Sequence, residues 1–349
     1  MMERFLERIA FSKYRDCFIV KGGILVISMI GISLRSTMDV DTTIRNFNLN
    51  EEKKYEIITE IKDIKLEDNI EFELLEISNI MDNMDYPGIR IHMNARLERL
   101  VVPIKIDIST GDVITPKEIV YHYPLLLENR TINLWSYNLE TVLAEKLQTI
   151  LSRSVLNTRM RDFYDVTILY NHYKDSIDYN NLVRAFDKTC EKRNTKNLLL
   201  EYNVILANIA TDATIHKLWK SYCKKYNYAK SIQFTDNIEI LYKIIEQMNK
   251  IKNFIDRNKN KFVGFIIFIL GVGLIVYEII HSGIIQNWWN SLSVEVQATT
   301  LIVAILTIVI LVASGLLLLY IKFLRHLGKL AGQKASKKIN SKKNMEKNL

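Results

Sequence analysis

The stretch from Phe18 to Ile44 constrains the fold more than any other part of the sequence. It consists of a short apolar run, a Gly-Gly turn, an apolar helix and then a strand that ends in Asp39 and Asp41. Alternate residues of a strand point to the same face, so these two carboxylates lie side by side while Val40 faces the other layer. The stretch therefore predicts part of an α/β sheet with a pair of acids on one face.

This pair of acids indicates a metal site beside a phosphate site. Two crowded carboxylates repel each other, and a divalent cation is the usual way to neutralise them. Gly22 and Gly23 open the helix, where backbone N–H groups not covered by any Cβ can hold a phosphate. Together the two features indicate nucleotide chemistry. An Asp-x-Asp pair also occurs by chance in surface loops, however, and a Gly-Gly pair is more often only a turn.

A third acid lies on another predicted strand. From Val101 to Ser109 the sequence alternates, with isoleucines at 104, 106 and 108 on one face and Lys105, Asp107 and Ser109 on the other. This alternation is typical of a strand whose apolar face packs on a core. We therefore expect Asp107 to lie beside the first strand. Residues 70–77 and 88–93 also alternate, whereas residues 51–65 have a helical period.

Helical patterns dominate after the third acid. The segment Thr115-Pro-Lys-Glu118 has the residues of a capping box with proline at the first helical position, which predicts the start of a helix. Farther on, one apolar stripe consists of Leu139, Leu143, Lys146 and Ile150. A lysine on such a stripe is costly unless its amine meets an anion or reaches water, and both explanations stay open.

The next predicted helix carries Asp162 and Asp165 one turn apart. The simplest interpretation is a surface ion pair between Arg161 and Asp165, which lie four residues apart. Aromatic residues follow in the later helices and are more simply core residues than a base-stacking platform. They are Tyr202, Trp219, Tyr222 and Tyr226.

Two long apolar runs predict a transmembrane hairpin over residues 262–321. No charged residue occurs from 262 to 277 or from 296 to 321, so each run is long enough to cross or nearly cross a bilayer. Trp288 and Trp289 lie between the runs, where interfacial aromatic residues are common, and basic residues flank the hairpin on both sides. This charge pattern places both chain ends in the cytoplasm. The alternative is a buried helical hairpin of a soluble protein.

The net charge of +8 belongs to the end of the chain, where residues 322–349 hold nine basic residues and one acid. The pattern favours a polybasic tail against anionic lipid and gives no support to nucleic-acid binding by the N-terminal domain. The three scattered cysteines are most simply reduced thiols, and the six histidines form no i, i+4 pair, so zinc is not expected. The charged first residues lack the apolar core of a signal peptide.

Five motifs in order resemble the motif series of the AbiEii-type abortive-infection nucleotidyltransferase toxins, a branch of the DNA polymerase β-like nucleotidyltransferase superfamily. The resemblance covers roughly residues 5–240. The motifs are Lys21-Gly-Gly, Arg35-Ser-Thr-Met-Asp-Val-Asp41, Lys105-Ile-Asp-Ile-Ser109, Glu140-Thr-Val-Leu-Ala-Glu-Lys-Leu147 and Arg159-Met-Arg-Asp-Phe-Tyr-Asp-Val166.

The resemblance implies an α/β fold with the mixed sheet of polymerase β-like nucleotidyltransferases, a helical domain and then the two-helix transmembrane hairpin. The expected parts are a nucleotidyltransferase α/β domain (1–112), a helical domain that completes the site (113–250), a basic linker (251–261), the hairpin (262–321) and a polybasic cytoplasmic tail (322–349).

The resemblance also implies the roles of individual residues. Asp39, Asp41 and Asp107 would hold two Mg²⁺ ions, with Mn²⁺ as an alternative, and Asp107 would hold metal or activate the attacking hydroxyl. Lys146 would bind the triphosphate, and Asp165 would complete the catalytic site. The further nucleotide-binding residues would be Lys21, Gly22, Gly23, Ser28 and Arg35.

The implied function is that of a type IV toxin or phage-defence effector that transfers a nucleotide from an NTP to an acceptor hydroxyl and releases pyrophosphate. The acceptor would be a tRNA 3′ end or a protein, and a cognate antitoxin would be a partner. The hairpin has no counterpart in the motif series. It would hold the enzyme at the bacterial inner (cell) membrane as a multi-pass protein with its catalytic domain in the cytoplasm. The alternative is a non-catalytic, membrane-anchored sensor or effector whose hairpin perturbs the bilayer.

Overall fold

The computed structural model describes residues 1–45, 51–80, 88–126, 128–195, 197–281, 290–297 and 299, and the chain divides into two compact units, Met1–Asn258 and Lys259–Leu349. The strands are β1 (Phe18–Lys21), β2 (Asp39–Ile44), β3 (Glu71–Ile80), β4 (Gly88–Leu97), β5 (Leu100–Thr110), β6 (Ile119–Pro124) and β7 (Thr131–Ser136). The early helices are α1 (Met2–Phe11), α2 (Gly22–Ile30) and α3 (Glu51–Lys62). The later helices are α4 (Leu139–Arg153), η1 (Ser154–Leu156), α5 (Met160–Tyr173), α6 (Tyr179–Lys192), α7 (Leu198–Thr211), α8 (Ala213–Lys225), η2 (Asn227–Ala229) and α9 (Phe234–His281).

The strands form one mixed sheet in the order β3-β4-β5-β2-β1-β7-β6. The pairs β1–β7 and β2–β5 are parallel, and the other neighbours are antiparallel. The prediction of a mixed α/β sheet followed by helices is therefore confirmed. Because β6 and β7 belong to the same sheet, its α/β part continues beyond the boundary expected at residue 112, as far as Ser136.

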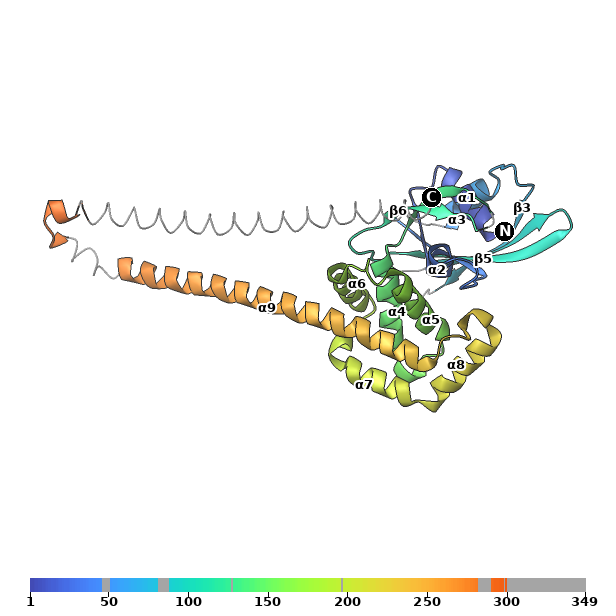
Figure 1. The fold of residues 1–349 in the computed structure, drawn as a ribbon. Coiled ribbons are helices and arrows are strands. Elements are labelled where there is room, and N and C mark those ends of the chain that lie inside the picture. The colour runs from blue at the N-terminus through green and yellow to red at the C-terminus, as the bar shows by residue number, and fades with distance from the viewer. Residues whose placement is uncertain are drawn as a thin grey trace, which may run out of the picture. The chain divides into compact units, whose positions relative to one another are not determined.

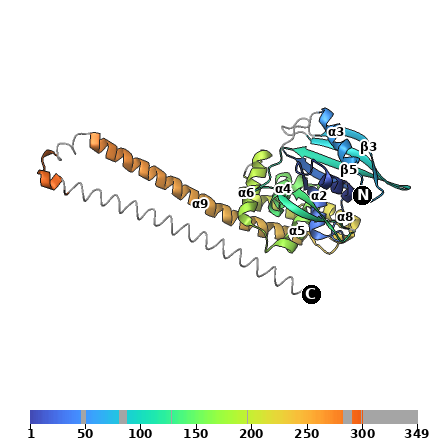
Figure 2. The same ribbon diagram turned by 90° about the horizontal axis from the view of Figure 1, so that it is seen from above.

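Helices cover the sheet on both sides. Helices α1 and α3 lie on one side, and α4, α5 and α8 gather on the other (Figure 1). Seen from above, α3, β3 and β5 occupy one end of the first unit, and α4, α5 and α6 occupy the other (Figure 2). The alternating isoleucines of β5 are buried, as the sequence predicts, and Phe5 of α1 packs edge-on against Phe72 of β3 with ring centroids 5.6 Å apart.

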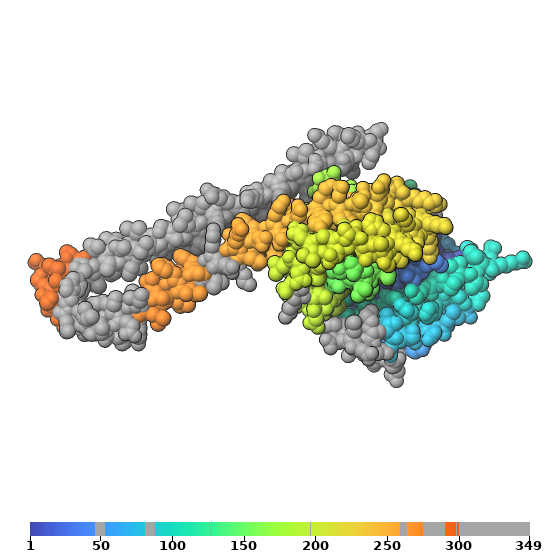
Figure 3. Space-filling view, turned by 90° about the horizontal axis from the view of Figure 1, so that it is seen from below, coloured from blue at the N-terminus to red at the C-terminus, as the bar shows by residue number. Residues whose placement is uncertain are grey.

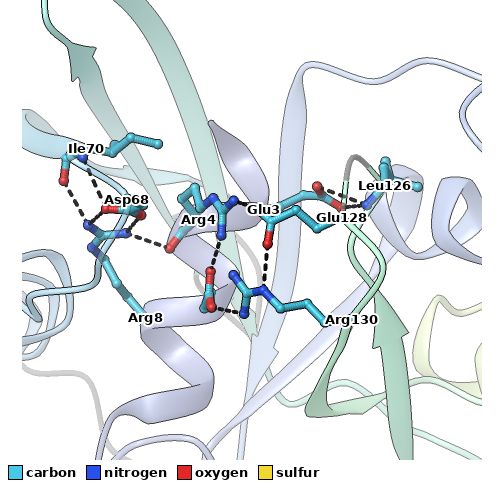
Figure 4. A network of polar contacts seen from close by, with 9 residues as sticks. Glu3, Arg4, Arg8, Asp68, Ile70, Leu126, Glu128 and Arg130 are labelled. Carbon is cyan, nitrogen blue, oxygen red and sulfur yellow. Dashed lines mark hydrogen bonds and ion pairs between the residues drawn. The ribbon is translucent and has the colours of Figure 1, made fainter.

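Ion pairs fix α1 to the sheet (Figure 4). Arg8 is 2% exposed and donates to both carboxylate oxygens of Asp68, at 2.8 and 3.0 Å, and to the carbonyl of Ile70. At the other side of the helix, the backbone N–H of Leu126 donates to Glu3 Oε1 at 3.0 Å. The helix thereby contacts the segments before β3 and after β6.

The strand with the two aspartates differs from the prediction in where these residues lie along it. The sequence suggests that the strand ends at Asp41, but β2 begins at Asp39 and continues to Ile44. The reason is its partner: β2 pairs with β5 in parallel from Asp39 opposite Lys105 to Ile44 opposite Thr110. Both acids therefore lie at the start of the strand, and Val40 is fully buried on the other face.

The helix predicted at Thr115 is absent, and β6 follows instead at Ile119. The side-chain amide of Asn138 donates to the carbonyls of Thr115 and Lys117, at 2.8 and 2.9 Å. The N–H of Thr115 donates to the hydroxyl of Thr141 at 3.1 Å. These backbone groups are bound by the start of α4, so they cannot make the bonds of a new helix.

The helical part of the first unit has its own core, to which the first turns of α9 contribute Leu241, Ile244, Ile245 and Met248. The aromatic residues Tyr202, Trp219 and Tyr222 are buried, in line with their interpretation as core residues.

The first predicted membrane run lies within α9, whereas nearly all of the second run lies outside the described residues. Among the helices that are described, none is by itself both long and apolar enough to cross a bilayer. The bent pair α7 and α8, at 66° to each other, meets this test by length and composition together, and Gly264–Leu274 is a shorter apolar stretch.

Candidate active site

A cavity of about 620 Å³ lies in the first unit, where the acid strands face α5 and α8. Its size falls in the range of small-molecule sites. From the sheet side it is lined by Gly22, Gly23, Arg35, Thr37, Asp39, Asp41, Lys105 and Asp107. From the helical side it is lined by Lys146, Thr158, Arg159, Met160, Arg161, Asp162, Leu218, Ser221, Tyr222, Lys225 and Tyr226. Figure 3 shows the yellow surface of α8 next to the blue and cyan surface of the sheet.

Strand pairing brings the three acids together. Asp41 of β2 lies directly opposite Asp107 of the parallel strand β5, and Asp39 lies opposite Lys105. Asp39 Oδ1 is 2.9 Å from Lys105 Nζ, and Asp107 makes two bonds of 2.8 Å with Arg90. Each of these carboxylates therefore has a basic partner on a neighbouring strand.

The Gly22-Gly23 turn contacts the remaining acid of the three, Asp41. The N–H of Gly23 donates to Asp41 Oδ2 at 3.3 Å. Gly22 has φ +63°, and a Cβ added there would lie 2.2 Å from the same oxygen. A Cβ at Gly23 would lie 2.7 Å from the guanidinium of Arg35. Only glycine fits at these two positions, since any side chain would displace the carboxylate or the guanidinium.

Burial raises the pKa of Asp41, and the like charges of Asp107 and Asp39 raise it further. The Gly23 N–H and the Lys21 ammonium oppose this rise without cancelling it. A carboxylate in this environment gains from a neighbouring cation.

Oxygen donors of this kind suit Mg²⁺ chemically. As the side chains are arranged, no three carboxylate, histidine or cysteine groups among the described residues lie close enough to share one ion. The cause is visible in the ion pairs, because the carboxylates of Asp39 and Asp107 are turned toward Lys105 and Arg90. The donor set is present on one face, and two of its members are held by cations of the protein.

Lys146, Asp165 and Arg35 form a buried ion-pair group in the wall of the cavity, with Asp165 beneath the surface. Lys146 Nζ is 2.6 Å from Asp165 and 3.0 Å from Asp162, so its amine meets anions of the protein itself. Asp165 is fully buried and accepts two bonds from Arg35, at 2.7 and 3.1 Å. The surface pair of Arg161 with Asp165 that the spacing suggests is therefore wrong.

Opposite charges set the pKa values of Asp165 and Lys146. Burial alone would raise the pKa of Asp165, but Lys146 and Arg35 outweigh it and hold the pKa below its ordinary value. Burial alone would lower the pKa of Lys146, but Asp165 and Asp162 outweigh it and raise the pKa. Asp165 and Lys146 therefore both stay charged near neutral pH.

Three of the predicted site residues do not line the cavity. Lys21 forms an ion pair with Asp112 and is 2.6 Å from the Ser109 hydroxyl. The Ser28 hydroxyl donates to the carbonyl of Leu25 at 2.7 Å. Asp165 lies beneath the surface, as described above. The other predicted residues, Gly22, Gly23, Arg35, Asp39, Asp41, Asp107 and Lys146, all line the cavity.

The structure adds residues that the sequence analysis did not select. Lys105 shares a strand face with Asp107, and this alternation was already visible in the sequence. Arg161, the α8 residues Ser221 and Lys225, and Tyr226 directly after α8 also line the cavity. No local pattern marks α8, because its place opposite the acids results from tertiary packing.

Comparison of the chain with known proteins identifies a family. Residues 4–238 match the family described as nucleotidyl transferase AbiEii toxin, type IV TA system. A search of curated protein sequences finds no match. The solved structures that match the chain include JHP933 from Helicobacter pylori, 14% identical with a TM-score of 0.39, where the match covers 75% of this chain and 94% of that one. A candidate nucleotidyltransferase from H. pylori is also 14% identical with a TM-score of 0.40, over 71% of this chain and 92% of that one.

Proposed function

Because the chain belongs to the AbiEii nucleotidyltransferase toxin family of type IV toxin–antitoxin systems, we propose that it transfers a nucleotide from an NTP to an acceptor hydroxyl within the cavity described above. The observation that carries the proposal is the contact between the Gly22-Gly23 turn and Asp41, on the face shared with Asp39 and Asp107. A phosphate cradle and three carboxylates are thereby exposed to one cavity.

In the proposed reaction the acceptor oxygen attacks the α-phosphorus of the NTP in line with the leaving group. The new oxygen–phosphorus bond forms while the bond from the α-phosphorus to pyrophosphate breaks, and the hydroxyl proton passes to one of the carboxylates. A divalent cation held by Asp39, Asp41 and Asp107 would neutralise charge on the reacting phosphate. Lys105 and Arg90 would have to release Asp39 and Asp107 for this role, since they pair with them here.

Other residues of the cavity position the reacting groups. The backbone of Gly22 and Gly23 supplies N–H groups at the start of α2, where the helix dipole favours an anion. Arg35 donates to the carbonyl of Gly23 at 3.0 Å and to buried Asp165. We therefore assign Arg35, Asp165 and Lys146 the role of holding this turn against α5. This role differs from the direct contact with the nucleotide that the family resemblance implies for Arg35 and Lys146.

The acceptor in this proposal is a tRNA 3′ end or a protein hydroxyl. The test incubates full-length protein with each α-labelled NTP and Mg²⁺, with and without total tRNA. We expect one NTP to label an acceptor, and we expect Asp41→Asn to reduce labelling by at least about 100-fold, as for groups that stabilise a transition state. The control is Asp63→Asn, which changes a carboxylate that is 59% exposed. Equal labelling by the Asp41→Asn protein would refute the proposal.

We further propose that the second unit associates with the bacterial inner membrane. Support comes from the part of α9 between Phe265 and Leu274, where large apolar side chains are between 42% and 67% exposed. Such a continuous apolar surface is typical of contact with lipid or another protein. In this arrangement the nucleotidyltransferase unit works in the cytoplasm, close to the membrane.

A further inference from the structure

The basic residues of the cavity differ in whether an acid of the protein neutralises them. Four of them have a carboxylate partner: Arg35 with Asp165, Lys105 with Asp39, Lys146 with Asp162 and Asp165, and Arg159 with Asp162. Arg161 and Lys225 line the same cavity, and the described part of the chain gives neither of them a carboxylate.

Tyrosine rings hold these two cations in place. Arg161 Nη2 donates to the hydroxyl of Tyr226 at 3.3 Å, and its guanidinium carbon lies 5.7 Å from the centre of that ring. Lys225 Nζ lies 5.4 Å from the same ring centre. Tyr226 is fixed in turn by Tyr222 and Tyr228, whose ring centroids lie 4.9 and 5.4 Å from its own. Cation–π contacts orient a cation without neutralising its charge.

The cavity therefore has an acidic wall on β2 and β5 and an uncompensated basic group on α5 and α8. A partly buried guanidinium without a counter-ion favours a bound anion, and its planar fork matches phosphate oxygens. Lys146, which the sequence suggested for this task, is already bound by two carboxylates.

We infer that Arg161 and Lys225 form the subsite for the β- and γ-phosphates of the NTP, which leave as pyrophosphate. The inference rests on the proposed function and assigns the orientation of the nucleotide within the cavity. The α-phosphate then lies between this pair and the three acids, and the acceptor enters from the acidic side. Arg161 binds the leaving group directly, and Tyr226 is a positioning residue that acts through Arg161.

The test measures binding of inorganic triphosphate to full-length protein by calorimetry, without acceptor. We expect Arg161→Gln to weaken binding about 10- to 100-fold and Lys225→Met about 3- to 10-fold, since hydrogen bonds to charged groups have effects of this size. Arg161→Lys keeps the charge and recovers part of the loss. The matched control is Lys224→Met, which changes the neighbouring exposed lysine of α8, outside the cavity lining, and leaves binding unchanged.

A second measurement separates the NTP from the acceptor. In the transfer assay both cavity variants should raise KM for the NTP and weaken inhibition by pyrophosphate, with little change in KM for the acceptor. Unchanged triphosphate affinity in both variants, or a rise in KM for the acceptor alone, would overturn the subsite. The proposed function is tested separately, because only equal labelling by the Asp41→Asn protein would refute it. Because Lys225 is exposed, its variant gives a clear result even if Arg161→Gln does not fold.

Discussion

At the scale of single residues, Gly22 and the buried charges shape the wall of the cavity. Gly22 and Gly31 both have φ values that favour glycine, +63° and +94°, but their surroundings differ. An added Cβ at Gly22 collides with Asp41, whereas at Gly31 it has no heavy atom within 4 Å. Substitution at Gly31 therefore measures backbone strain alone, and substitution at Gly22 adds displacement of the carboxylate.

We expect Gly31→Ala to lose about 1 to 3 kcal/mol of stability, because it forces a non-glycine residue into a sparsely populated conformation, and Gly22→Ala to lose at least as much because its Cβ also collides with Asp41. Nucleotide transfer per folded molecule should fall steeply only in Gly22→Ala, since Asp41 must move. Thermal unfolding and the transfer assay measure the two effects. Equal activity in the two variants would show that the close approach to Asp41 has no role in catalysis.

The buried pair of Arg35 and Asp165 should dominate stability near the site. Asp165→Asn leaves Arg35 and Lys146 with an uncompensated charge at a fully buried position, and we expect a loss of about 3 to 5 kcal/mol in denaturant unfolding. The control is Glu73→Gln, whose pair with Arg96 is 45% exposed on both sides, is screened by water and should change stability little. Similar losses in both variants would contradict this account.

The same carboxylate gives a prediction about pH. Because the pKa of Asp165 in the folded protein lies below its ordinary value of 3.8, its contribution is complete above that pH and is lost as the pH falls through the folded-state pKa. We therefore expect the stability of the wild type to fall below about pH 4 more steeply than that of Asp165→Asn. Unfolding curves between pH 2 and 6 measure the difference, and parallel curves would contradict it.

At the scale of elements, the start of α4 organises the connection between the sheet and the helices. Asn138 caps α4 by accepting from the N–H of Thr141, and its amide also binds the carbonyls of Thr115 and Lys117. The buried side chain of Asn138 thus begins α4 and also holds the segment from Thr115 to Lys117. The capping sequence at Thr115 cannot form its own helix because α4 uses its backbone groups.

We expect Asn138→Ala to cost more than an ordinary helix cap. Loss of the cap alone costs about 1 kcal/mol, and the carbonyl of Lys117, left without the Asn138 amide, adds about 1 to 3 kcal/mol. The carbonyl of Thr115 keeps a bond from the Thr141 hydroxyl at 3.2 Å. Asp178→Ala is the comparison, because Asp178 caps α6 through Asn180 and Asn181 at an exposed position. Thermal unfolding should show a clearly larger drop for Asn138→Ala, and equal drops would mean that its bonds to Thr115 and Lys117 do not stabilise the fold.

At the scale of the whole molecule, the chain combines a compact unit that holds the cavity with a second unit from Lys259 onward. If the second unit binds lipid as proposed, full-length protein should float with vesicles that contain anionic lipid, and residues 1–258 should remain unbound. Flotation of both forms, or of neither, would contradict the proposed membrane contact. Toxicity of residues 1–258 that depends on Asp41 would assign the toxic activity to nucleotide transfer, whereas toxicity of the full chain with Asp41→Asn would assign it to the second unit.

The sequence alone determined the acidic face of the site. Strand alternation is local, with a period of two residues, so Asp39, Asp41 and Asp107 could be placed on exposed faces opposite Val40 and the isoleucines of β5. The order of the motifs also indicated the nucleotidyltransferase family, which the match over residues 4–238 establishes. The roles of the individual acids remain predictions.

Only the tertiary structure decided which groups face these acids and which charges are already neutralised. Arg35 and Asp165 are 130 residues apart in the chain, and the α8 wall is more distant still from β2. No periodicity records such contacts, because they depend on how whole helices pack against the sheet. The same packing turned Lys21 toward Asp112, bound Lys146 to two carboxylates and left Arg161 as a cation without a carboxylate partner among the described residues.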